Sequence, residues 1–104
     1  MKRDYTYIDD IVMGILSCLQ VDLVECEHRI YNLGNNKPVS VSSLISQCEK
    51  IVDKKANIVQ QNSCICDVPI TYADIEKAKR ELNYNPKTPL IIGLKKTYLA
   101  MSKT

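Results

Sequence analysis

The 104-residue chain contains no tryptophan, no phenylalanine and only three glycines. Its aromatic residues are six tyrosines, so the apolar interior must come mainly from Ile, Leu and Val. Gly14, Gly34 and Gly93 are widely separated in the sequence. A phosphate-cradling loop needs clustered glycines, because its backbone N–H groups must approach the anion closely. The sequence therefore excludes a glycine-rich dinucleotide loop and a P-loop from this chain.

Long apolar runs are also missing. The longest, "IVMGILSCL", is too short to cross a bilayer. The opening "MKRDYTYIDD" has acids and tyrosines where a signal peptide carries its apolar region. We therefore expect a cytoplasmic protein with no membrane partner.

Histidine and cysteine chemistry is poorly supported. The single histidine, His28, has no neighbour in sequence that would orient it as the base of a Cys–His enzyme. Cys64 and Cys66 lack the two-residue spacing of a zinc knuckle, and His28 is far from them. We predict no catalytic residue and no metal ligand. The five cysteines, three of them in helix-like segments, are interpreted as small buried hydrophobes in a reducing compartment.

The charge is close to balanced, with 14 Lys and Arg against 12 Asp and Glu and a net charge of +2. This excess is too small to indicate a phosphate-backbone partner. The most basic stretch, Lys77 to Arg80, is flanked by Glu76 and Glu81, as on an ordinary solvated helix face. We expect no nucleic-acid partner.

Hydrophobic periodicity predicts one domain over residues 1–104, of mixed α/β class, with four helices and short strands. Strands are expected over 3–8, 28–34 and 56–61, with a turn at Gly34 and the asparagines after it. Four helix starts are expected, at Asp9 or Asp10, at Ser40, at Asp74 and at Thr88–Pro89. Asn83 and the later Pro86 are expected to close the third helix.

Several motifs resemble one family. "MKRDYTYIDDIVMGI", "RIYNLGNNKPVSV" and "DVPITYADIEKAKRELNYNPKTPL" are similar, in order and spacing, to segments of extended short-chain dehydrogenase/reductases that act on nucleotide sugars. Among these, the first motif is closest to that of UDP-glucuronate 4-epimerases. The resemblance covers essentially the whole chain. It implies the C-terminal, substrate-binding lobe of such an enzyme, with the Rossmann NAD-binding part absent.

The resemblance also implies what this chain lacks. The family binds NAD through a glycine-rich loop and uses a Tyr-x-x-x-Lys pair, and no tyrosine here is followed by lysine four residues later. We expect the chain to bind no cofactor and to be inactive alone, as a truncated epimerase. NAD would enter only if a separate N-terminal Rossmann chain, the product of a split gene, completed the enzyme.

The resemblance implies family roles for two residues. Arg3 matches the arginine that contacts the nucleotide pyrophosphate, and Asp67 matches the acid that binds the uridine ribose hydroxyls. A guanidinium and a carboxylate suit a diphosphate and a vicinal diol, respectively. The chain departs from the pattern at Cys66, which replaces the family glycine, and near Cys64, where many relatives have a second arginine. UDP-sugar binding is therefore expected to be weak or lost.

Two alternatives stay open. The chain is also interpreted as a non-enzymatic remnant that self-associates as a homo-oligomer, through a surface once covered by the missing lobe. A fragment of a sugar-nucleotide 4,6-dehydratase or decarboxylase would share the same C-terminal plan.

Overall fold

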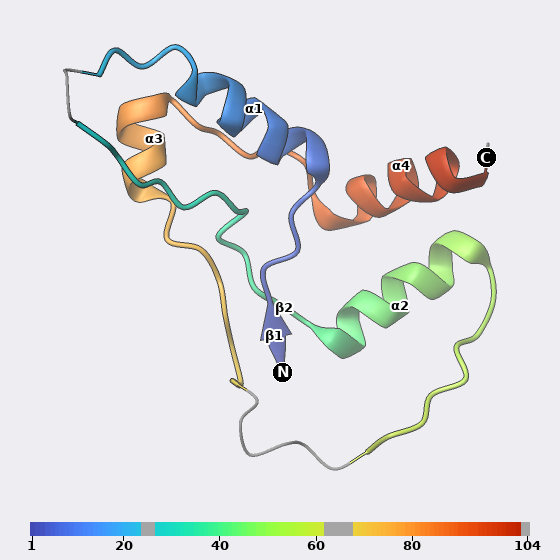
Figure 1. The fold of residues 1–104 in the computed structure, drawn as a ribbon. Helices are drawn as coiled ribbons and strands as arrows, with labels where there is room; N and C mark the ends of the chain where they lie inside the picture. Colours follow the sequence, from blue (N-terminus) through green and yellow to red (C-terminus); the bar gives the residue numbers. More distant parts are fainter. Residues whose placement is uncertain (24–26, 62–67, 103–104) are drawn as a thin grey trace.

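The computed structural model describes residues 1–23, 27–61 and 68–102, and within them the chain forms four helices and one two-stranded sheet (Figure 1). The helices are α1 (Ile8–Cys18), α2 (Val41–Val52), α3 (Glu76–Leu82) and α4 (Leu90–Ser102). The strands are β1 (Lys2–Arg3) and β2 (Val39–Ser40), which pair antiparallel with Arg3 opposite Val39. The predicted class, a small mixed domain of four helices and short strands, is confirmed.

Strand β1 has a neighbour on each side. On one side β1 pairs with β2, and on the other side Lys2 forms a parallel bridge to Ile70. The Lys2 N–H donates to the Pro69 carbonyl at 2.8 Å, and the Thr71 N–H donates to the Lys2 carbonyl at 3.2 Å. The strand expected over 3–8 is wrong beyond Arg3, because Tyr7 is already the N-cap of α1.

The helices lie in two pairs, α1 beside α3 and α2 beside α4 (Figure 1). The buried hydrophobic side chains described belong to the first pair and the segment after it; they are Ile75, Ala78, Leu82 and Tyr84. Gly14 lets α1 approach this core closely, because a Cβ there would lie 2.7 Å from a methyl of Leu33 and 3.1 Å from the Tyr84 ring. The core therefore sits under α1 and α3, away from α2 and α4.

Two of the expected helix ends are confirmed. The Ser43 N–H donates to the Ser40 hydroxyl oxygen at 3.1 Å, so Ser40 caps α2 as predicted. Asn83 adopts the left-handed conformation, with φ 55°, and ends α3. Asp74 lies just ahead of α3 and accepts the Glu76 N–H at 3.2 Å, although the helix itself begins at Glu76.

The expected start of α1 is wrong. The helix begins at Ile8, its N-cap Tyr7 makes no side-chain capping bond, and Asp9 and Asp10 lie inside the first turn. Asp10 is buried, and its carboxylate accepts backbone N–H groups from Thr88 at 3.2 Å and Lys87 at 3.5 Å. Asp10 therefore joins α1 to the segment ahead of α4 instead of capping its own helix. Helix α4 begins at Leu90, one residue after the predicted Thr88–Pro89 start.

The strands predicted over 28–34 and 56–61 are also wrong. Neither segment pairs as a strand with a neighbour among the residues described. Ile30, Ile58 and Val59 are 72%, 60% and 79% exposed, whereas Tyr31 and Leu33 are partly buried against the core. A strand is stabilised by pairing, so residues with strand propensity cannot form one without a partner edge.

The interpretation of the cysteines as buried is wrong for Cys18, which is exposed, while Cys48 is half-buried; Cys26, Cys64 and Cys66 lie outside the described residues. In the described ranges no helix is both long and apolar enough to cross a membrane.

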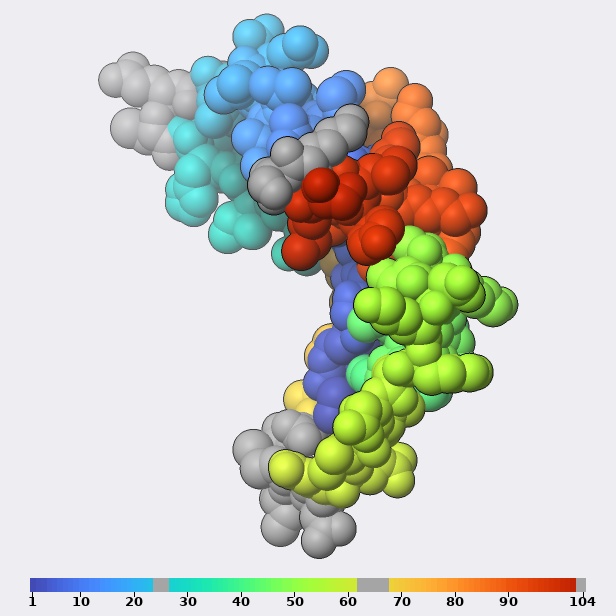
Figure 2. Space-filling model, turned by 90° about the vertical axis from the view of Figure 1, so that its right-hand side faces the viewer, coloured from blue at the N-terminus to red at the C-terminus, as the bar shows by residue number. Residues whose placement is uncertain are grey.

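The chain is elongated, with principal extents of 54 × 39 × 21 Å and a radius of gyration of 16.9 Å. A compact chain of this length has a radius of gyration of about 13 Å. The accessible surface is 8276 Å² for a mass of 11.8 kDa, about 2,400 Å² more than a folded monomer of that mass exposes. Figure 2 shows the segment after α2 reaching away from the other helices. The chain therefore leaves much of its surface uncovered, and large apolar side chains such as Leu19 and Val59 are among the exposed residues.

Candidate functional site

Arg3, predicted to bind a ligand, is the second residue of β1 and is half-buried. Its Nη1 donates to the Lys2 carbonyl at 2.7 Å and to the Val68 carbonyl at 2.9 Å. Val68 lies 65 positions further along the chain and directly follows Asp67. Asp67 itself lies outside the described residues. Arg3 therefore lies beside Val68, the described residue that follows the other predicted site residue in sequence.

Among the described residues, the Arg3 guanidinium makes side-chain hydrogen bonds through one of its three nitrogens. Arginine has five N–H donors in a planar fork that fits carboxylate and phosphate oxygens. Both described bonds use Nη1, and neither uses Nε or Nη2. The side chain is therefore anchored on one nitrogen in a way that leaves the rest of the fork able to bind an oxyanion.

Sequence reasoning missed Asp4, which adjoins Arg3. Its carboxylate accepts backbone N–H groups from Asn35, Asn36 and Lys37 at 3.1, 2.9 and 3.4 Å, and from Ala73 at 3.2 Å. The sequence signal for this role was the turn "GNN", because asparagine tolerates the left-handed conformation. Asn36 adopts it with φ 55°. Such turns direct successive N–H groups at one anion.

Tyr84 supports the same turn from the core, because its hydroxyl donates to the Gly34 carbonyl at 2.6 Å. Burial of its side chain, reinforced by the negative charge of Asp10, raises the pKa of Tyr84 above the ordinary tyrosine value. The hydroxyl therefore stays protonated and acts as a hydrogen-bond donor.

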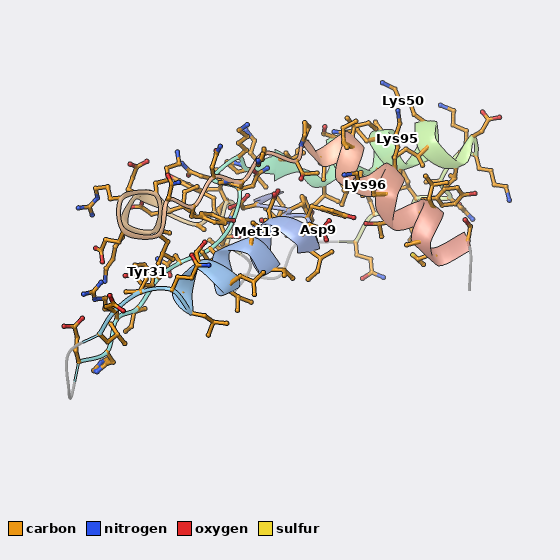
Figure 3. All side chains as sticks on the ribbon, turned by 90° about the horizontal axis from the view of Figure 1, so that it is seen from above. Asp9, Met13, Tyr31, Lys50, Lys95 and Lys96 are labelled. Atoms are coloured by element: carbon orange, nitrogen blue, oxygen red, sulfur yellow. The ribbon has the colours of Figure 1, made fainter. Side chains whose placement is uncertain are left out.

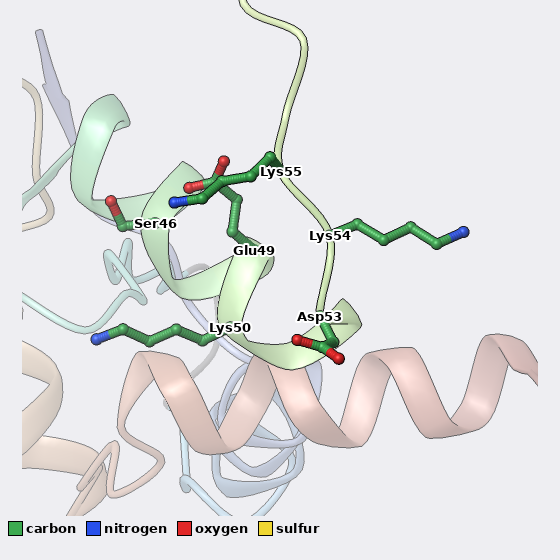
Figure 4. A pocket seen from close by; sticks show the side chains of 6 residues that line it. All are labelled: Ser46, Glu49, Lys50, Asp53, Lys54 and Lys55. Carbon is green, nitrogen blue, oxygen red and sulfur yellow. The ribbon is translucent and has the colours of Figure 1, made fainter.

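Several surface hollows lie elsewhere on the described residues. One, of about 370 Å³, is lined by Ser46, Glu49, Lys50, Asp53, Lys54 and Lys55 at the end of α2 (Figure 4). Its lysines alternate with carboxylates, Lys54 points away from the others, and the Glu49 carboxylate already accepts the Ala56 N–H at 2.7 Å. This hollow therefore has the mixed charge of a solvated surface and is a poor anion site.

Another hollow, of about 320 Å³, is mostly apolar and lies between residues 5–8 and the start of α4. Leu44 of α2 lines it, and the Lys96 ammonium lies 5.6 Å from the centre of the Tyr7 ring nearby. Neither hollow is lined by Arg3. Across the described residues, no three His, Cys, Asp or Glu side chains are grouped closely enough to hold a metal ion.

Comparisons with known proteins place the sequence. No model of a known protein family matches it. The chain is 41% identical over 96 residues to a UDP-glucuronate 4-epimerase of Thermodesulfobacterium geofontis. It is 42% identical over 112 residues to UDP-glucuronate 4-epimerase 2 of Arabidopsis thaliana. These alignments cover 91% and 92% of this chain but only 28% and 25% of the relatives, so the chain spans roughly a quarter of their length.

A solved structure agrees with the sequence relatives. The UDP-glucuronic acid 4-epimerase from Bacillus cereus, in complex with UDP-glucuronic acid and NAD, matches the fold with a TM-score of 0.83 at 32% identity. The match covers 96% of this chain and 32% of that one. The resemblance to NAD-dependent UDP-sugar epimerases, drawn from the sequence motifs, is confirmed.

Proposed function

We propose that this chain is the C-terminal, UDP-sugar-binding part of an NAD-dependent epimerase of the UDP-glucuronate type. The observation that carries the proposal is the anchoring of Arg3 on the Val68 carbonyl, 2.9 Å away and next in sequence to Asp67. The Bacillus cereus structure, which contains UDP-glucuronic acid and NAD, supports a nucleotide sugar as the ligand.

Each of the two residues has a defined part in this proposal. Arg3 binds the diphosphate through charge-assisted hydrogen bonds from Nε and Nη2. Asp67 accepts both hydroxyls of the uridine ribose. Cys66 and the lack of a second arginine near Cys64 weaken the grip, so we expect an affinity below that of a complete enzyme.

The chain contributes no redox chemistry in this proposal. Its three scattered glycines and its lack of a Tyr-x-x-x-Lys pair do not fit an NAD site. NAD would oxidise and re-reduce the sugar at C4 only where an N-terminal Rossmann part, in the same or another polypeptide, supplies the cofactor loop. The chain alone is expected to bind UDP-sugar without turning it over.

Titration of ¹⁵N-labelled protein with UDP-glucuronate, UDP and uridine tests this function. We expect UDP and UDP-glucuronate to perturb the amides of Arg3 and Val68. Arg3→Ala should weaken UDP binding about tenfold or more and leave uridine binding little changed, since the lost contact is to phosphate. The exposed arginine of α3 provides the matched control, Arg80→Ala.

Three results would contradict the proposal. They are the absence of any UDP binding, an equal loss in the Arg80→Ala control, and epimerisation by the chain with NAD alone. A 4,6-dehydratase or decarboxylase origin shares the same plan, and the names of the relatives favour the epimerase.

A second candidate function, self-association, is favoured by α1. Large apolar side chains along one side of this helix are exposed: Ile8 61%, Val12 42%, Ile15 52%, Leu16 48% and Leu19 78%. Side chains of α1 project away from the rest of the chain (Figure 3). This stripe, Ile8–Leu19, has Asp9 as its one exposed charge. Exposed apolar helix faces of this kind are rare on monomers.

A second copy of the chain is the occupant that we propose for the stripe. The surface excess of about 2,400 Å² on one copy is larger than the roughly 800 Å² that each partner buries in a standard stable interface. A symmetric α1–α1 contact would use the same stripe on both copies. Each copy would thereby gain the apolar burial that its small core lacks.

Sedimentation velocity tests this second function with Leu16→Lys, and Ile58→Lys serves as the matched control. Ile58 is 60% exposed and lies far from α1 in sequence. We expect the wild-type chain and Ile58→Lys to form dimers and Leu16→Lys to be monomeric. A monomeric wild-type chain at high concentration would contradict self-association while leaving the nucleotide proposal intact.

A further inference from the structure

We propose that Asp4 is the positioning residue for the contact between Arg3 and the diphosphate. Its carboxylate holds the backbone on both sides of β1, so that the Arg3 guanidinium can reach the diphosphate. This inference rests on the proposed function, since it names the residue on which Arg3 depends. Asp4 does not contact the ligand in this proposal and acts through Arg3.

Asp4 first fixes the segment that leads into β2. Its Oδ2 accepts the Asn36 N–H at 2.9 Å and the Asn35 N–H at 3.1 Å, and its Oδ1 accepts the Lys37 N–H at 3.4 Å. The left-handed conformation of Asn36 turns these N–H groups toward one point. Val39, two residues after Lys37, is the register partner of Arg3.

The same carboxylate fixes the other neighbour of β1. Its Oδ2 accepts the Ala73 N–H at 3.2 Å, from a residue 69 positions away. Ala73 follows the segment Val68–Thr71, whose backbone bonds to Lys2 and whose Val68 carbonyl receives the Arg3 guanidinium. One side chain therefore joins the three backbone segments that surround Arg3.

An aspartate is required here for its acceptor count and its length. An ionised carboxylate offers about four acceptor sites and no donor, which suits a cluster of N–H groups. An asparagine amide would direct its own N–H₂ at donors, and a glutamate would need more room. Room is scarce, because a Cβ built at Gly34 would lie 2.7 Å from the Asp4 Oδ2.

The consequence for Arg3 follows from its position in the chain. Arg3 and Asp4 are adjacent, so the carboxylate bonds fix the backbone from which the guanidinium extends. The Nη1 anchor on Val68 lasts only while Val68 stays at its place beside β1. Loss of the Asp4 bonds frees both neighbours of β1 and so disorders the grip without altering Arg3 itself.

A double-mutant cycle tests the inference. We expect Asp4→Asn to weaken UDP binding about tenfold, because roughly 1.4 kcal/mol of lost positioning corresponds to that factor. In an Arg3→Ala background the same change should weaken UDP binding less than about twofold, since the residue acts through Arg3. The control Asp22→Asn removes the same charge at an exposed site after α1 and should leave the affinity unchanged.

The results that overturn the inference are specific. If Asp4→Asn weakens UDP binding equally with and without Arg3, or not at all in a folded protein, Asp4 does not position Arg3. Circular dichroism establishes folding, and where Asp4→Asn does not fold, Asp4→Glu keeps the charge, displaces the carboxylate and is expected to weaken UDP binding similarly.

Failure of the proposed function is distinguishable from failure of this inference. If the wild-type chain binds no UDP, the function is wrong, and the positioning is read from the Arg3 Nε–H heteronuclear NOE without ligand. We expect this NOE to fall in Asp4→Asn and to be unchanged in Asp22→Asn. An equal NOE in all three proteins would refute the positioning role.

Discussion

The hydroxyl of Tyr84 donates a buried hydrogen bond of 2.6 Å to the carbonyl of Gly34, and the two residues are 50 positions apart along the chain. Tyr84 belongs to the core under α1 and α3 and is 4% exposed. Gly34 directly precedes the turn whose N–H groups bind Asp4. This bond therefore connects the hydrophobic core to the turn that Asp4 binds, next to Arg3.

Tyr84→Phe is expected to lower the free energy of unfolding by about 1–2 kcal/mol, because it leaves the buried Gly34 carbonyl without its donor. Urea denaturation followed by circular dichroism measures the change. Tyr98→Phe is the matched control, because Tyr98 is 45% exposed on α4 and should change stability little. Equal effects of the two substitutions would show that the buried bond is unimportant.

The burial of the Tyr84 hydroxyl predicts an alkaline instability. Burial raises the pKa of Tyr84 in the folded state, with the charge of Asp10 adding to the effect. The stabilisation from the protonated hydroxyl is complete below the unfolded pKa of about 10 and is lost as the pH rises through the folded pKa. The stability difference between wild type and Tyr84→Phe should therefore shrink above about pH 10. A difference that is constant with pH would contradict this assignment.

Gly34→Ala is expected to disrupt the hydrogen bonds that the Asp4 carboxylate accepts from Asn35, Asn36 and Ala73. The added Cβ would lie 2.7 Å from the Ala73 Cβ and 2.7 Å from the Asp4 Oδ2, and neither atom ends a long flexible side chain. Overpacking of this kind typically costs about 1–3 kcal/mol. Amide shifts at Asn35, Asn36 and Ala73 should accompany the loss in a ¹⁵N correlation spectrum.

Gly14→Ala provides the contrast to that substitution. There the nearest atoms are the terminal methyl groups of Leu33, which can rotate away, and alanine favours the helix. The cost should be smaller than at Gly34. A larger cost at Gly14 than at Gly34 would show that the turn tolerates a side chain.

Ser40→Ala is expected to destabilise the chain by about 0.5–2 kcal/mol through loss of the α2 cap. Ser46→Ala, in the exposed middle of the same helix, should be neutral or slightly stabilising, since alanine has the higher helix propensity. Thermal unfolding of the two variants measures the difference. Equal melting temperatures would contradict the capping role of Ser40.

The sequence determined the features that depend on neighbours within a few residues. Ser40 caps α2 through a bond to Ser43, and Asn83 ends α3 through its own left-handed conformation, so local chemistry sufficed for both. The apolar periodicity located the helices, and the motifs around Arg3 identified the relatives. These features need no knowledge of what lies across the fold.

Tertiary structure decided the rest. Segments 28–34 and 56–61 are predicted as strands but form no strand pairing in the described ranges, because pairing requires an edge that the local sequence does not supply. Asp10 and Asp4 act on backbone N–H groups 78 and 69 positions away, respectively. A carboxylate fits such a role only once distant donors converge on it, and that convergence is a property of the packed chain.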